Sequence, residues 1–204
     1  MASDEEYIKK ARITQFLVFL NIIMFISVYL FSKNDELFYF FALYNRRVIE
    51  QHEIWRIFTS IFLHQTWFHL ISNMIILYLY GSLIERHYKS YEFLLIYIAS
   101  GLIGNLFSLI LFPLDTISAG ASGAIFGLIG TAFVLAARSN DRVVLIIGLL
   151  YLIYFLIVGF QPGINVWAHI FGLLGGIAIS YALNKINDKI RSDEITPSEE
   201  ELKP

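Results

Sequence analysis

Three clusters of polar residues interrupt the long apolar runs of this chain. Polar groups are costly to bury in a bilayer, so each cluster is a candidate functional site. The clusters contain His64, His69 and Asn73; Gly120, Ser122 and Gly123; and His169 with Gly172. A serine becomes an effective nucleophile when a base removes its proton, and imidazole is the usual base. Ser122 as nucleophile and His169 as base would together perform acyl transfer.

The oxyanion that develops during acyl transfer needs fixed hydrogen-bond donors. His69 and Asn73 are four residues apart, so they project from one face of a helix and can donate toward one point. The backbone N–H of Ser122 is a third candidate donor. These groups complete a possible reaction site without a metal ion or other cofactor.

Several other chemistries are excluded by residue type or spacing. The chain has no cysteine, which rules out disulfides, thiolate metal sites and a cysteine nucleophile. A zinc protease would need His-Glu-x-x-His, but His52-Glu53 is followed by Arg56 at the last position. Aspartyl catalysis would need two membrane-embedded carboxylates, whereas Asp115 and Asp141 fall in loops. A net charge of −2 without a basic cluster argues against a nucleic-acid partner.

The composition is that of a membrane protein. Of the 204 residues, 57% are hydrophobic and 16% are charged, against roughly 25% charged in soluble domains. A spanning helix needs about 20 mainly apolar residues. Six such runs lie near residues 13–32, 67–85, 91–112, 120–137, 143–160 and 164–183. We therefore predict an all-α membrane protein in which six transmembrane helices form a compact bundle in the lipid bilayer.

Three regions follow from this reading: a cytoplasmic segment 1–12, the membrane domain 13–184 and a polar cytoplasmic tail 185–204. The tail has the composition of a disordered end. Inside the membrane domain, loop 33–66 mixes aromatic and charged residues and should be interfacial and partly helical. Glu85, at the end of the second helix, is expected to form a structural ion pair or to anchor a loop.

The lysine and arginine counts orient the chain, because cytoplasmic loops carry an excess of these residues. With a cytoplasmic N-terminus, 11 of the 15 lysines and arginines fall on that side and both termini are cytoplasmic. The second, fourth and sixth helices then run inward, which places all three polar clusters at their outer ends. We expect a multi-pass protein of a cell membrane with its active site toward the extracytoplasmic face.

Glycines would allow the two reacting helices to approach closely. Gly123 and Gly127 lie on the fourth predicted helix, and Gly172 and Gly176 lie on the sixth. Small residues at four-residue spacing let helix backbones pack together in membranes. Ser122 and His169 could then meet directly across this contact.

Each candidate also has a purely structural interpretation. A serine in an apolar helix most often bonds to the carbonyl four residues earlier. His169 could be a hydrogen-bonded core histidine, and His69 and Asn73 could bridge helices. All of these interpretations would have to apply to residues that lie at one depth in the membrane. Because unrelated polar residues would scatter in depth, the coincidence favours a shared site.

The motifs together resemble the rhomboid intramembrane serine proteases, from about Phe41 to Gly176. They occur in the family's order: Trp55-Arg56, Phe62-Leu-His64 with His69 and Asn73, Gly81 with Glu85, Ser100-Gly-Leu-Ile-Gly104-Asn105, Gly120-Ala-Ser122-Gly123, and Ala168-His169 with Gly172 and Gly176. The resemblance implies a Ser122–His169 dyad without a third carboxylate. It also implies an oxyanion site at His69 and Asn73, an aromatic support for the histidine ring at Phe126, and a structural role for Trp55-Arg56.

The resemblance further implies substrates that are single-span membrane proteins, admitted laterally past the fifth helix and the loop 160–167. Two functions remain open. The first is an intramembrane serine endopeptidase that cleaves transmembrane segments near the outer face. The second is a catalytically silent rhomboid-like protein that binds or escorts transmembrane clients. Loss of the serine or the histidine would mark the second function, and both residues are present.

Overall fold

The computed structural model describes residues 11–33, 35–139, 142–143, 146, 148–150, 152–153 and 164–195. Within this part of the chain, five helices are long and apolar enough to span a membrane. They are α2 (Arg12–Phe31), α6 (Trp67–Ile84), α7 (Ser90–Leu111), α8 (Ser122–Ser139) and α10 (Val166–Ile195). The fold is therefore mainly helical with several candidate spans, as predicted. The predicted span 143–160 lies largely outside the described residues, so the count of six stays a prediction.

Capping groups determine where the helices near the polar clusters begin. Thr66 precedes α6, and its side-chain oxygen accepts from His69 N at 3.1 Å. Asn165 precedes α10, and its Oδ1 accepts from Ala168 N at 3.0 Å. Both contacts satisfy backbone donors that the first turn of a helix leaves unpaired. His69 and His169 therefore lie in the first turns of their helices.

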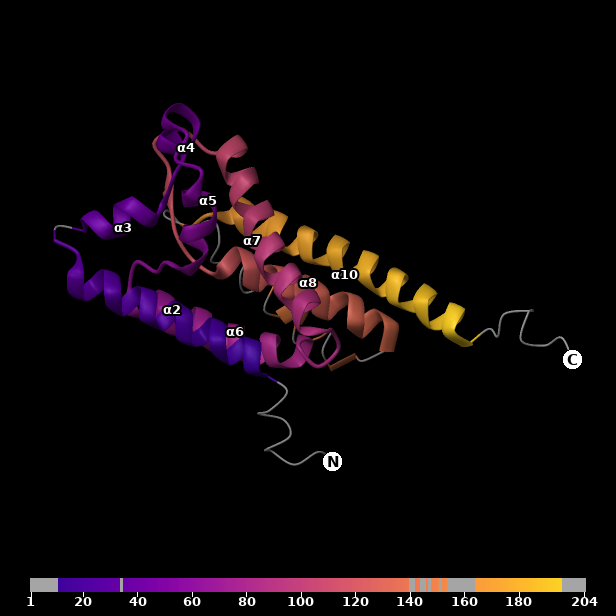
Figure 1. Cartoon of the computed structure of the whole chain (residues 1–204). Helices are drawn as coiled ribbons and strands as arrows, with labels where there is room; N and C mark the ends of the chain where they lie inside the picture. The colour runs from indigo at the N-terminus through magenta and orange to yellow at the C-terminus, as the bar shows by residue number, and fades with distance from the viewer. Residues whose placement is uncertain are drawn as a thin grey trace, which may run out of the picture.

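Helix α8 lies at the centre of the bundle, where it packs against α6, α7 and α10 (Figure 1). Of the candidate spans in the described residues, it is the most buried, with 61% of its span inside the protein. Helix α2 packs beside α6 at the edge of the bundle (Figure 1). The residue that begins α8, Ser122, is thus held by the best-packed helix.

Helices α8 and α10 touch through their backbones. A Cβ added at Gly172 would lie 2.9 Å from the carbonyl carbon of Gly123, and one added at Gly176 would lie 2.5 Å from the Cα of Gly127. Real Cβ atoms essentially never approach this closely, so only glycine fits at these positions. The small-residue spacing predicted this close approach.

Loop 33–66 is partly helical, as predicted. Buried Arg56 organises it by donating to the carbonyl oxygens of Tyr39 and Ala42 and to the Glu53 carboxylate. Strand β1 of this loop pairs antiparallel with β2, with Leu43 opposite Ser118. The elements are α3 (Glu36–Phe41), β1 (Leu43–Tyr44), α4 (Asn45–Gln51), α5 (Trp55–Thr59) and the 3-10 helix η1 (Ser60–Phe62), with β2 at Ile117–Ser118.

Glu85 anchors the start of α2 to the end of α6. Its carboxylate accepts from Ile13 N and Thr14 N, each at 2.8 Å, and from Thr14 Oγ1 at 2.7 Å. A carboxylate at a helix N-terminus accepts from backbone N–H groups that lack a partner within the helix, and it is attracted by the positive end of the helix dipole. The sequence predicts that Glu85 forms an ion pair or anchors a loop. Its contacts are those of an anchor, which holds the start of α2.

Residues 185–195 differ from the sequence-based expectation. The composition predicts a disordered tail from residue 185, but α10 continues as a helix to Ile195. Asp188 pairs with Arg138 of α8 at 2.8 Å, and Asn187 donates to Glu92 of α7 at 3.1 Å. These polar contacts attach the extension to two neighbouring helices, and hydrophobic patterning alone does not reveal them.

Candidate active site

The serine and histidine of the separate polar clusters meet in the structure. Ser122 Oγ, at the start of α8, lies 2.5 Å from His169 Nε2 in the first turn of α10. The hydroxyl and the imidazole nitrogen are therefore in hydrogen-bond contact. It depends on the close approach of the two helices, which the glycines beside each residue permit.

Phe126 supports the histidine ring from α8. Its ring lies one turn after Ser122 and stacks on the His169 imidazole, with a centroid separation of 4.8 Å and an interplanar angle of 23°. His169 is 6% exposed. Stacking and burial together restrict how the imidazole can rotate relative to the serine.

Gly120 brings His69 beside the serine. Its φ of +146° lies in a region that side chains disfavour. A Cβ at Gly120 would lie 2.9 Å from His69 Cε1 and 3.5 Å from Ser122 Oγ, so both groups border the same small space. Only glycine leaves that space open in front of the nucleophile.

Asn73 lies one turn beyond His69 on α6 and is 7% exposed. Among the described residues, no acceptor pairs with its Nδ2. A buried donor without a partner costs stability, and such costs are typical of groups held ready for a ligand. His69 and Asn73 therefore form a row of potential donors on the side of α6 that begins beside Ser122.

His64 lies behind His69. The two rings form an edge contact with centroids 5.0 Å apart, and His64 is 2% exposed. Burial, together with the nearby His69, lowers the pKa of His64 to about 3. His64 is consequently neutral at ordinary pH and packs against His69 without adding charge to the site.

The expected residues thus divide by position. The structure brings together Ser122, His169, Phe126, Gly120 and His69. Asn73 follows on α6, and His64 lies behind His69. The backbone contact between α8 and α10 is formed by Gly123 and Gly172. The first half of loop 160–167, residues 160–163, falls outside the described residues. The sequence motifs do not include Asn165, which contacts Ser118 and caps the helix that carries His169. A single polar residue in a short connection is a weak sequence signal. The available clue is its place four residues before His169, where a helix begins.

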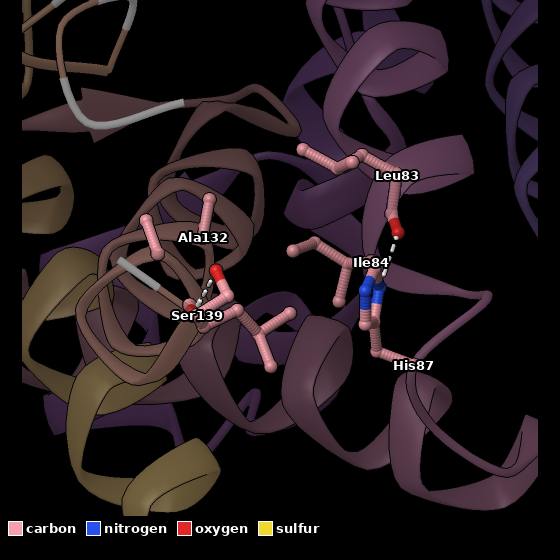
Figure 2. Close-up of a pocket in the computed structure, with 7 residues that line it drawn as sticks. Leu83, Ile84, His87, Ala132 and Ser139 are labelled. Carbon is pink, nitrogen blue, oxygen red and sulfur yellow. Dashed lines mark hydrogen bonds between the residues drawn. The ribbon is translucent and has the colours of Figure 1, made fainter. Parts of the chain in front are cut away.

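A small crevice elsewhere in the bundle is not part of this site. Figure 2 shows it between the C-terminal ends of α6 and α8, with Leu83 and Ile84 facing Ala132 and Ser139. Its volume of about 50 Å³ is far below the roughly 300–1,000 Å³ of ligand pockets. The polar groups at its edge bond to backbone carbonyls four residues earlier: His87 Nδ1, in the turn after α6, with Leu83 O, and Ser139 Oγ with Leu135 O (Figure 2).

The arrangement around Ser122 provides the groups that acyl transfer requires. A hydroxyl contacts an imidazole that can take its proton, and further donors lie beside the hydroxyl. The described residues include no group of three or more metal-binding side chains. The chemistry that fits the geometry is that of a serine hydrolase.

Several known proteins are similar in sequence to this chain. The rhomboid domain profile matches residues 51–186, which include Ser122 and His169. The chain is 31% identical over 137 residues to the putative rhomboid protease YdcA of Bacillus subtilis, covering 63% of this chain and 67% of YdcA. It is 36% identical over 180 residues to the rhomboid protease GluP of the same bacterium, covering 85% of this chain.

A third relative is the inactive RHOMBOID-like protein 8 of Arabidopsis thaliana, 35% identical over 135 residues, or 63% of this chain. The chain spans 35% of the length of GluP and 38% of the length of this plant protein. The rhomboid domain match, residues 51–186, contains the candidate site. Because the rhomboid domain match covers more than half of the chain, the chain belongs to the rhomboid family.

Proposed function

We propose that this protein is an intramembrane serine endopeptidase that uses Ser122 and His169 to cleave transmembrane segments. The observation that carries the proposal is the 2.5 Å contact between Ser122 Oγ and His169 Nε2. Two relatives, YdcA and GluP, are named rhomboid proteases, which supports the same activity here.

The reaction has two halves. Ser122 Oγ attacks the scissile carbonyl carbon while His169 Nε2 takes the hydroxyl proton. The tetrahedral intermediate collapses, the C–N bond breaks, and His169 gives the proton to the leaving amine. A water molecule then attacks the acyl ester, losing its proton to His169, and the returning proton restores Ser122.

Charge develops on the carbonyl oxygen in both halves. His69, Asn73 and the backbone N–H of Ser122 are the donors that we assign to this oxyanion. The open position at Gly120, bordered by His69 and Ser122, offers room for it. Phe126 takes over the orienting role that a carboxylate has in a triad, because its ring holds the imidazole by stacking.

The substrates that suit this site are transmembrane segments of single-span proteins. Carbonyls in a helix are already hydrogen-bonded, so a segment must unwind before Ser122 can reach its backbone. Glycine or proline near the cleaved bond lowers the cost of unwinding. The distribution of lysine and arginine supports a cell-membrane location with this site toward the extracytoplasmic face.

A second function is favoured by one observation: the related RHOMBOID-like protein 8 is named inactive. In that case this protein would bind or escort transmembrane clients without cleaving them. Ser122 and His169 are both present and in contact, which favours the protease.

Cleavage in liposomes distinguishes the two functions. Purified wild type, Ser122→Ala and the control Ser139→Ala are reconstituted with a fluorescent single-span reporter. Ser139 is a matched control, since it lies at the opposite end of α8 and bonds within its own helix. We expect cleavage by wild type and Ser139→Ala alone. Cleavage that survives Ser122→Ala would refute the proposal, and reporter binding without cleavage by wild type would support the escort function.

A further inference from the structure

Asn165 connects three elements around the Ser122–His169 pair. Its Nδ2 donates to Ser118 Oγ at 2.9 Å and to Ser108 Oγ at 2.7 Å, and its Oδ1 accepts from Ala168 N at 3.0 Å. Both amide protons and the amide oxygen are therefore used. The three partners belong to β2, to α7 and to the first turn of α10.

We propose that Asn165 is a positioning residue that fixes the serine loop relative to the helix bearing the histidine. The inference rests on the proposed function, since it assigns Asn165 a role in aligning that reaction's two groups. Asn165 does not touch the reacting atoms. It acts through Ser118 on one side and through the start of α10 on the other.

On the serine side, Ser118 is four residues before Ser122. This segment is held at two further points: Ser118 pairs with Leu43 in the strand pair, and Gly120 N donates to Ser60 O at 3.0 Å. Both of those contacts join the segment to loop 33–66. Asn165 supplies the link from the same segment to α10, the helix that carries the base.

On the histidine side, Asn165 caps the turn that contains His169. The cap bonds Ala168 N, the residue directly before the histidine. Gly123 and Gly172 fix how closely α8 and α10 approach. The cap and the Ser118 bond add a polar link between the start of α10 and the serine segment, at the level of the reacting groups.

The amide suits this position better than other small polar groups. A serine at residue 165 could keep the cap, because serine is a good N-cap residue. Its hydroxyl lies one bond closer to the backbone than the amide nitrogen and carries a single proton, so it cannot reach across to Ser118 and Ser108 while it caps α10. Asn165→Ser therefore separates the helix cap from the link to the serine loop.

The test uses Asn165→Ser, Asn165→Ala and the control Asn187→Ala. Asn187 is also on α10 and also donates one side-chain bond to a neighbouring helix, at Glu92, far along the helix from His169. Three quantities are measured for each full-length variant in liposomes or detergent: kcat and KM for a single-span reporter, the rate of fluorophosphonate labelling, and the thermal midpoint. Labelling reports the alignment of Ser122 and His169 without depending on substrate entry.

A positioning role predicts that Asn165→Ser lowers kcat and the labelling rate about 10- to 100-fold, as expected for small misplacements of reacting groups. KM and the thermal midpoint should stay near wild type. Asn165→Ala should lose at least as much activity, and Asn187→Ala should keep full activity. Adding Ser118→Ala to Asn165→Ser should cause no further loss, because both changes break the same link.

Two results would overturn the inference. The first is wild-type labelling and kcat in Asn165→Ser. The second is a loss of activity that only follows the thermal midpoint, with Asn187→Ala affected equally. In both, wild type still reacts and the proposed function stands. If wild type neither cleaves nor labels, the proposed function fails and the role of Asn165 fails with it.

Discussion

Replacing Gly172 with alanine should push apart the two helices that carry Ser122 and His169. The new Cβ would lie 2.9 Å from the carbonyl carbon and 3.2 Å from the Cα of Gly123, the residue next to the nucleophile. Ordinary van der Waals contact begins at 3.4 Å, and the carbonyl oxygen of Gly123 is closer still. Because these neighbours are backbone atoms, they cannot swing aside, and the helices must separate.

The expected effect on activity is large. Relieving the contact requires a shift on the order of 1 Å, and misplacement by 1 Å can cost about 100-fold in rate. The same shift would stretch the 2.5 Å Ser122–His169 contact beyond good hydrogen-bond length. Overpacking of this kind costs about 1–3 kcal/mol of stability, which is enough to lower the thermal midpoint but not to prevent folding.

Gly175→Ala is the matched control, three residues further along α10. Its Cβ would meet Ile103 Cδ1 at 3.0 Å, the far end of a flexible side chain that can move. Alanine also favours a helix by about 1 kcal/mol over glycine. Reporter cleavage and fluorophosphonate labelling should fall about 100-fold in Gly172→Ala and stay near wild type in Gly175→Ala. Equal activity in the two variants would refute the reasoning that backbone contact aligns the dyad.

Three further predictions concern other contacts. Glu85→Gln should lower stability by about 1–3 kcal/mol, since an amide donor would face donors at the start of α2; an unchanged thermal midpoint contradicts this. Gly120→Ala should reduce cleavage at least 10-fold, roughly the cost of a small misplacement, because the new side chain would strike His69; retained activity contradicts the placement of His69. Arg46 lowers the pKa of Asp115 below 3.8, so the stabilisation exists above that pH and is lost as pH falls through the lowered pKa. The thermal midpoints of wild type and Asp115→Asn should differ near neutral pH and converge in acid as the pH falls through the lowered pKa of Asp115, whereas a pH-independent difference would contradict the assignment.

Hydrophobic pattern predicted the spans well where apolar runs end abruptly. The predicted runs 13–32, 67–85 and 91–112 correspond to α2, α6 and α7 within one residue at each end. The run predicted from residue 120 begins as α8 at Ser122, because Gly120 adopts a φ of +146° outside the helix. The backbone N–H of Gly120 donates to Ser60 O of loop 33–66, a distant contact that no local pattern encodes.

Residue type and spacing also indicated which polar groups would come together. Ser122 and His169 are far apart in sequence, but glycines beside each one signalled the close approach of their helices. Contacts made by single polar residues were harder to foresee. Asn165 joins three elements, and Asp188 pairs with Arg138 on the extension of α10, yet neither lies in a repeated pattern.

The most direct test of the central claim is to locate the adduct of a fluorophosphonate probe by mass spectrometry. Such probes react with serines that a neighbouring base activates. We predict a single adduct on the peptide containing Ser122 in wild type, lost in His169→Ala and retained in His87→Ala. His87 is a suitable control, because it lies in the turn after α6, where its Nδ1 bonds to Leu83 O away from Ser122. An adduct on another serine, or one on Ser122 that forms equally fast without His169, would contradict the dyad.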